Sequence, residues 1–181
     1  MMMYMPNLLT LARIAMVPWL IVLLQQQDFF WSLLVFIAAG ISDGLDGYIA
    51  KKYNAITKLG ILLDPLADKA LLVSSYVMLA IMQIIPFWLV VVVVFRDIVI
   101  IVGYLLMEIF FDSVTIKPLI VSKFNTAVQI TFVVMVLVSL AWKLEMSTLI
   151  NFISYLVFIT SVVSGAAYVS IWFKKTTDSP I

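Results

Sequence analysis

Four aspartates lie close together in the stretch 43–68 of an otherwise apolar chain. Asp43 and Asp46 are three positions apart, and Asp64 and Asp68 are four positions apart. On an α-helix, either spacing places the two side chains on one face. An Asp at the centre of a membrane helix costs about 2.5–3.5 kcal/mol. Four of them in one short stretch therefore require a compensating positive charge, whereas a single Asp would fit an ordinary interfacial charge equally well.

Two helix ends that each present two carboxylates predict a metal site. Oxygen ligands favour a hard divalent cation, so we expect one or two Mg²⁺ or Mn²⁺ ions. The chain has no Cys and no His, which excludes a thiolate or imidazole zinc site. Gly47 and Gly60 bracket the loop between the pairs, and glycine lets a ligand approach the backbone closely. The nearby cations, which suit a phosphorylated substrate, are Lys51, Lys52, Lys58 and Lys69.

The composition predicts an all-α integral membrane protein. Of 181 residues, 65% are hydrophobic and 12% are charged, which is too apolar for a soluble domain. Six spans of about 20 residues would use most of the chain, so we expect six transmembrane helices in one bundle. Their expected ranges are 8–24, 29–50, 59–82, 87–110, 122–142 and 149–172. A net charge of +1 argues against nucleic acid as a partner.

Three connections between these helices, at 25–28, 83–86 and 143–148, are expected to be short. The first helix is expected to be retained rather than cleaved as a signal peptide. The residues 51–58 are expected to form a basic loop between the two Asp pairs. Seven lysines fall on the same side of a six-helix model as the Asp pairs, and only Lys143 lies in a loop on the other side. The positive-inside rule then places the termini and the acidic site in the cytoplasm.

The run from Asp43 to Ala50, followed by Gly60, Asp64 and Asp68, resembles the signature of the CDP-alcohol phosphotransferase family. These integral membrane enzymes join a CDP-linked donor to an alcohol and release CMP. The resemblance covers nearly the whole chain, so residues 1–181 are expected to form one membrane domain with its signature at 43–68. The family usually has Arg where this chain has Lys51, and lysine lacks the planar fork that suits phosphate.

The resemblance implies roles for individual residues. The four aspartates would bind two divalent metal ions, and Asp68 would also be the general base for the acceptor hydroxyl. A metal-bound carboxylate is a weak base, so this second role requires loose ligation of Asp68. Residues expected to bind the CDP part of the donor are Gly47, Ala50, Lys51 and Gly60. The donor is expected to be CDP-diacylglycerol, with its acyl chains in a groove between the second, fourth and fifth helices.

The acceptor is expected to be of the glycerol type. The stretches FRDIVIIVGYLL and IKPLIVSKFNTAVQ resemble the cardiolipin-forming branch of the family, whose acceptor is phosphatidylglycerol. The alternative acceptor is glycerol 3-phosphate, used by the branch that usually has Arg-Glu at Arg96-Asp97 and Lys at Asn125. A phosphodiester needs fewer cations than a phosphate monoester, which favours phosphatidylglycerol. Arg96 and Lys123 are the candidate acceptor-binding residues, and Arg96 and Asp97 need not pair because adjacent helical residues point about 100° apart.

Other interpretations remain open. Asn125, Thr126 and Gln129 would either receive an acceptor head group or form interhelical hydrogen bonds. Arg13, in the first helix, would either hold a substrate phosphate or reach the interface. A small ion or proton transporter would also contain intramembrane charges, but it predicts acids at mid-membrane depth in two repeats, and no repeat is visible. A non-catalytic assembly subunit would not need all four aspartates.

The resemblance further implies a homodimer embedded in the lipid bilayer. A small-residue patch on the sixth helix, from Ser161 to Ala167, is one possible seam, because small residues permit close packing. The expected location is the bacterial inner membrane, with multiple spans and the active site on the cytoplasmic side.

Overall fold

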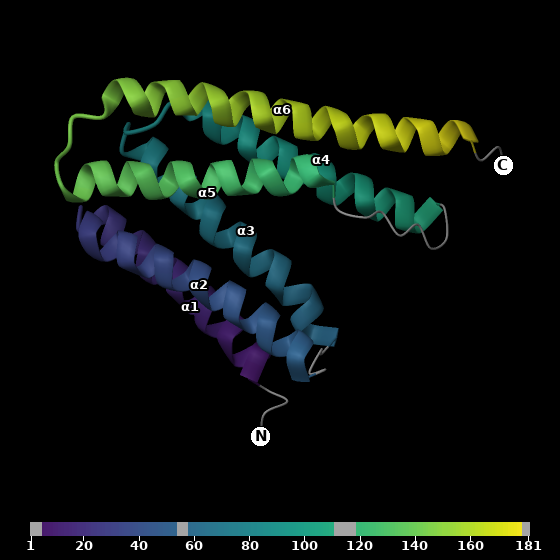
Figure 1. Cartoon of the computed structure of the whole chain (residues 1–181), viewed down its shortest axis with the longest axis horizontal. Coiled ribbons are helices and arrows are strands. Elements are labelled where there is room, and N and C mark those ends of the chain that lie inside the picture. The colour runs from purple at the N-terminus through teal and green to yellow at the C-terminus, as the bar shows by residue number, and fades with distance from the viewer. Residues whose placement is uncertain (1–4, 54–57, 111–118, 179–181) are drawn as a thin grey trace. The chain divides into compact units, whose positions relative to one another are not determined.

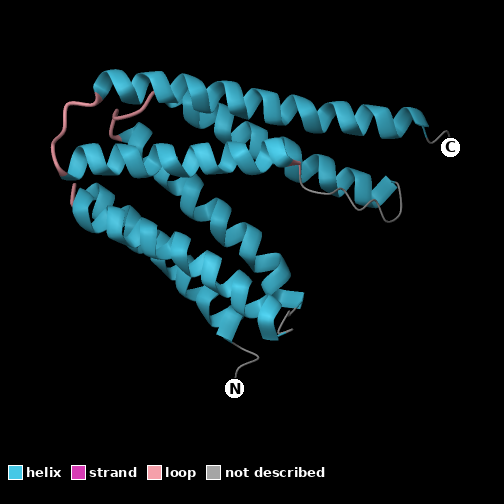
Figure 2. Ribbon diagram, in the orientation of Figure 1, coloured by secondary structure: helices cyan, strands magenta, loops and turns pink. Residues whose placement is uncertain are grey.

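In a computed structural model, the described residues 5–53, 58–110 and 119–178 form six α-helices (Figures 1 and 2). Their bounds are α1 (Met5–Gln25), α2 (Phe29–Tyr53), α3 (Lys58–Ile81), α4 (Phe87–Phe110), α5 (Ile120–Ala141) and α6 (Ser147–Asp178). No strand occurs in these ranges. Side chains are described for 11–42, 69–103, 106 and 119–173. The all-α fold expected from the sequence is therefore confirmed.

The helices are longer than expected at two places that carry lysines. Lys51 and Lys52 lie in the last turn of α2 rather than in a loop, and α3 already begins at Lys58. Helix α6 continues through Lys174 and Lys175 to Asp178, where the sequence suggested a tail. Cations are favourable near the C-terminal end of a helix because they complement its dipole, which accounts for the extension of α2.

The chain divides into two compact units, so the single bundle of six spans is not confirmed. The first unit comprises Met1–Ile84 and Val133–Met146, and the second comprises Ile85–Phe132 and Ser147–Ile181. In the first unit, α1 packs along both α2 and α3, and in the second, α4 packs along α6. Helix α5 contributes its first part to the second unit and its last part to the first.

Two helices are long and apolar enough to cross a membrane, judged by length and composition over the described residues: Ile120–Ala141 and Ser147–Phe173. Shorter apolar helical stretches are Leu11–Gln25, Phe29–Ser42 and Lys69–Ile81. Large apolar side chains are exposed on several helices, including Trp19 at 56%, Phe95 at 66% and Phe152 at 70%. Exposed apolar surface of this kind is typical of regions that contact a membrane or another protein.

Three helices of the first unit end in the same way. Gln27, Gln83 and Lys143, which follow α1, α3 and α5, have φ values of 60°, 58° and 52°. After α1, the N–H of Asp28 donates to the carbonyl of Leu23 at 3.0 Å, which is the longer bond of a Schellman motif. These left-handed residues stop each helix and turn the chain within a few residues, as the polar turn at 25–28 predicted.

In the second unit, a glycine of α4 lies against an indole ring of α6. A Cβ placed on Gly103 of α4 would overlap the ring of Trp172 on α6. Trp172 also lies 6.1 Å from the ring of Tyr168, measured between centroids. The absence of a side chain at position 103 therefore leaves room for the Trp172 indole against α4.

We expect Gly103→Ala to destabilise the protein by about 1–3 kcal/mol, because a methyl group would be forced into the space of Trp172. Thermal unfolding in detergent micelles measures the effect. Gly40→Ala on α2 is the matched control, since a Cβ there has no neighbour within 4 Å. The control should be neutral or stabilising by up to about 1 kcal/mol, as alanine favours helices. Equal melting temperatures for the two variants would contradict the packing described here.

Candidate active site

The backbone places the two Asp pairs on consecutive helix ends. Asp43 and Asp46 lie in the C-terminal half of α2, and Asp64 and Asp68 lie in the first three turns of α3. Only residues 54–57 separate the two helices along the chain. The structure does not describe the side chains or the surroundings of the signature residues. This holds for the four aspartates and for Gly47, Ala50, Lys51 and Gly60. Their roles therefore stay predictions.

The donor set of the signature fits a hard divalent cation, because it consists of carboxylate oxygens alone. Two acidic pairs on successive helix ends provide enough ligands for two ions. Among the side chains that the structure describes, no group of three or more acidic residues forms a second candidate site. Binding of Mg²⁺ or Mn²⁺ by the signature stays a prediction from its donor set.

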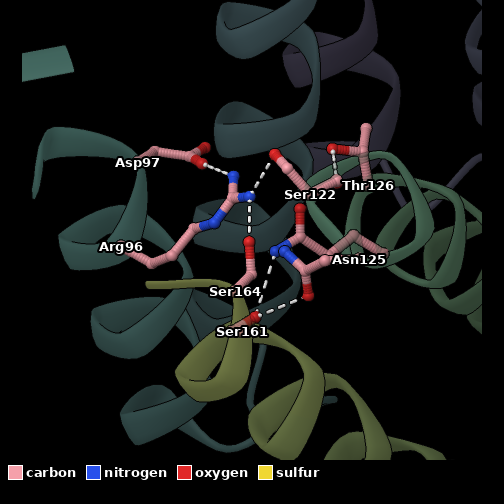
Figure 3. A network of polar contacts seen from close by, with 8 residues as sticks. Arg96, Asp97, Ser122, Asn125, Thr126, Ser161 and Ser164 are labelled. Atoms are coloured by element: carbon pink, nitrogen blue, oxygen red, sulfur yellow. Dashed lines mark hydrogen bonds and ion pairs between the residues drawn. The ribbon is translucent and has the colours of Figure 1, made fainter. Parts of the chain in front are cut away.

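A buried arginine organises the polar interior of the second unit (Figure 3). Arg96 of α4 is 5% exposed, and its Nη1 donates to Oδ1 of Asp97 at 2.8 Å. Its Nη2 donates to Ser122 Oγ of α5 and to Ser164 Oγ of α6, both at 2.6 Å. The guanidinium therefore joins three helices, which explains why one charged side chain is tolerated among apolar helices.

The pairing of Arg96 with Asp97 corrects the expectation that these neighbours need not interact. Their Cα–Cβ directions diverge on the helix, but the long arginine side chain bends back to reach the carboxylate. The Nε of Arg96 has no hydrogen-bond partner in the described part of the chain. The three bonds from Nη1 and Nη2 therefore do not use the Nε–H donor.

A second polar group links α5 to α6 deeper in the same unit. Ser161 Oγ donates to Asn125 Oδ1 at 3.1 Å, and Gln129 Nε2 donates to Ser161 Oγ at 3.3 Å. All three residues are fully buried. Of the two interpretations of the α5 polar residues, interhelical hydrogen bonding thus holds for Asn125 and Gln129. Thr126 instead bonds to the backbone carbonyl of Ser122 at 3.1 Å.

The other sequence-predicted residues are distributed as follows. Lys123 is exposed and lies outside the hydrogen-bond network drawn in Figure 3. Arg13 is fully buried in the first unit. Ser161 and Ser164 of the small-residue patch face the interior of the second unit, so these two positions cannot form the surface of a dimer seam. Ser161 and Ser164 are three positions apart, so they share one face of α6, and this spacing is the sequence feature that indicates their common burial.

Comparison with known proteins decides the family. The family model described as CDP-alcohol phosphatidyltransferase matches residues 3–167. The chain belongs to the CDP-alcohol phosphatidyltransferase family. The match includes both Asp pairs, Arg96 and Ser164, so the signature and the Arg96 cluster fall within one family domain.

Relatives in this family carry names from two branches. A Drosophila melanogaster protein named "Probable cardiolipin synthase (CMP-forming)" is 31% identical over 180 residues, covering 91% of this chain and 56% of the relative. "Cardiolipin synthase (CMP-forming)" of Homo sapiens is 37% identical over 144 residues, 71% of this chain and 48% of the relative. "CDP-diacylglycerol--glycerol-3-phosphate 3-phosphatidyltransferase" of Bacillus subtilis is 35% identical over 108 residues, 51% of this chain and 55% of the relative. The chain spans about half the length of the curated relatives it matches.

Proposed function

We propose that this protein transfers a phosphatidyl group from CDP-diacylglycerol to phosphatidylglycerol, forming cardiolipin and releasing CMP. The observation that carries the proposal is the family match over residues 3–167, which contains the complete four-Asp signature at its expected spacing. Family membership also favours an enzyme over a transporter or an assembly subunit, because the signature is that of phosphatidyl transfer.

The donor would bind at the facing ends of α2 and α3. Asp43, Asp46, Asp64 and Asp68 would hold two Mg²⁺ or Mn²⁺ ions, which neutralise the diphosphate and the leaving CMP. Gly47, Ala50 and Gly60 would leave room for the cytidine, and Lys51 would add positive charge beside the diphosphate. Lys51 acts as a point charge, since it cannot form the bidentate contact of an arginine.

Transfer requires removal of one proton from the acceptor. The primary hydroxyl oxygen of phosphatidylglycerol attacks the phosphorus bonded to the diacylglycerol oxygen, and the bond from that phosphorus to the CMP oxygen breaks. Asp68 accepts the hydroxyl proton. Because ligation to a cation weakens a carboxylate base, we propose that Asp68 is the most loosely ligated of the four.

Arg96 favours the lipid acceptor over a phosphate monoester. Two of its three nitrogens already donate to Asp97, Ser122 and Ser164, and the neighbouring carboxylate offsets its charge. An acceptor with one negative charge suits this environment better than glycerol 3-phosphate, which carries close to two. The Bacillus subtilis relative, named for glycerol 3-phosphate, keeps that acceptor as the second candidate. Lys123 stays a proposed acceptor contact.

The surroundings of the reaction are part of the same proposal. The protein would span the bacterial inner membrane several times, with the signature on the cytoplasmic side, as the distribution of lysines indicates. It would act as a homodimer, as the family resemblance implies. Neither feature is needed for the chemistry at α2 and α3.

The test is CMP release by purified protein supplied with CDP-diacylglycerol and Mg²⁺ or Mn²⁺. Phosphatidylglycerol and glycerol 3-phosphate are offered in parallel, and the lipid product is identified by mass spectrometry. We expect CMP and cardiolipin only with phosphatidylglycerol. Product only with glycerol 3-phosphate would assign the protein to the other branch, and no CMP with either acceptor would contradict the proposed function.

A further inference from the structure

The second unit contains a pocket of about 490 Å³ between α4 and α6. Helix α4 lines it with Val91, Phe95 and Val99, and α6 lines it with Val162, Ala166 and Val169. These six side chains carry no polar atoms, and the hydroxyl of Ser161, which also lines the pocket, already donates to Asn125, so water in the pocket would have few hydrogen-bond partners. A pocket with such walls is suited to hydrocarbon.

Arg96 forms the boundary between this pocket and the polar interior. Its side chain is one wall of the pocket, and a Cβ placed on Gly165 would lie 3.7 Å from its Cγ. Its guanidinium, in contrast, turns toward Ser122 and Ser164, as Figure 3 shows. The methylene stem thus faces the pocket while the charged group faces the polar side. Arg96 therefore contacts both the apolar pocket and the polar interior of the second unit.

The mouth of the pocket lies on an apolar surface. Val91 is 52% exposed, Phe95 66% and Val162 47%. In a membrane protein, such a surface is in contact with lipid acyl chains, so a chain can enter the pocket sideways without crossing water.

We propose that the α4–α6 pocket binds one acyl chain of the acceptor lipid. The inference rests on the proposed function, because it assigns the chain to phosphatidylglycerol. The pocket shares Arg96 with the candidate acceptor site, whereas the donor signature lies on α2 and α3. An anionic phospholipid complements both sides of Arg96: its acyl chain matches the apolar walls, and its negative charge matches the cationic guanidinium. Glycerol 3-phosphate has no acyl chain and would gain nothing from the pocket.

The test fills the pocket from a position at its rim. Ala166→Trp introduces an indole at an exposed lining residue, so the change should not disturb folding. Val163→Trp is the matched control, because Val163 is 51% exposed on the same helix and does not line the pocket. We expect Ala166→Trp to raise the KM for phosphatidylglycerol about tenfold, since exclusion of even two methylene groups has that effect. The kcat value and all constants of Val163→Trp should stay near wild type.

A binding readout separates this inference from the proposed function. Phosphatidylglycerol with a diazirine in one acyl chain is photolysed with the full-length protein, and mass spectrometry locates the adducts. We expect adducts within 91–99 and 161–169 in wild type and in Val163→Trp, and their loss in Ala166→Trp. Adducts in the pocket without any CMP release would support the binding site while contradicting the proposed reaction.

Three results would overturn the inference. The first is that the wild-type protein releases CMP normally while Ala166→Trp and Val163→Trp have the same KM and kcat. The second is equal competition for the adducts by excess phosphatidylcholine, which would indicate ordinary surrounding lipid. The third is a loss of self-association confined to Ala166→Trp, measured by light scattering in detergent, which would assign the pocket to a second copy of the chain.

Discussion

Replacing Asp68 with Asn is expected to lower the rate of CMP release by about 10²–10⁴-fold, the usual contribution of a general base. The substitution keeps the size of the side chain and removes the charge that would accept the hydroxyl proton. Initial rates with CDP-diacylglycerol and phosphatidylglycerol measure the effect at saturating Mg²⁺. Helix α3 should remain intact, because Asn replaces Asp at similar volume, and circular dichroism in detergent checks this.

Asp28→Asn is the control for the loss of one negative charge. Asp28 is exposed in the turn before α2 and lies outside the signature. Its variant should turn over at the wild-type rate. A fully active Asp68→Asn protein would show that Asp68 neither takes the proton nor holds a necessary metal ion.

Replacing Asp97 with Asn is expected to destabilise the protein by about 3–5 kcal/mol, because it leaves Arg96 buried without its ion-pair partner. Unfolding in increasing denaturing detergent measures the change. The double variant Arg96→Met with Asp97→Leu removes both charges and should recover most of that stability, because apolar pairs of similar volume often replace buried ion pairs. The double variant should nevertheless lose activity with phosphatidylglycerol if Arg96 contacts the acceptor.

Glu145→Gln serves as the stability control, since Glu145 is exposed in the loop between α5 and α6. It should unfold at the wild-type detergent concentration. If Asp97→Asn were as stable as this control, the contact at 2.8 Å would contribute nothing and Arg96 would be held by Ser122 and Ser164 alone. The single variants Arg96→Met and Asp97→Leu complete a double-mutant cycle with the double variant, and that cycle isolates the coupling between the two charges.

The helices could be predicted from the sequence because their apolar stretches are long and the turns are polar. Five of the six expected ranges agree with the structure to within three residues at each end, and 87–110 agrees at both. The C-terminal end of α6 was missed because Lys174 and Lys175 resemble a polar tail, although such residues can continue a helix. The division into two units could not be predicted, since it depends on which helix faces meet and not on where helices begin.

The candidate site was predictable where spacing carries the information. The Asp pairs were found because spacings of three and four place side chains on one helix face. The Arg96–Asp97 contact was missed because helix geometry argues against neighbours, while a long flexible side chain can overcome it. The bond from Arg96 to Ser164 was also missed, because 68 positions separate the two residues and local sequence patterns do not indicate contacts between such distant residues.

The adjacency of Arg96 and Asp97 has a consequence for biosynthesis. An ion pair between neighbouring residues can form as soon as α4 is helical, before α5 and α6 have emerged from the ribosome. An unpaired arginine opposes membrane insertion by about 2.5–3.5 kcal/mol at a helix centre. In the membrane-spanning arrangement proposed above, the carboxylate one residue away would let α4 enter the bilayer as an electrically compensated segment, and the hydroxyls of Ser122 and Ser164 would join it later. Arg96 would therefore gain its partners in the order in which the ribosome makes them: Asp97 first, then Ser122, then Ser164.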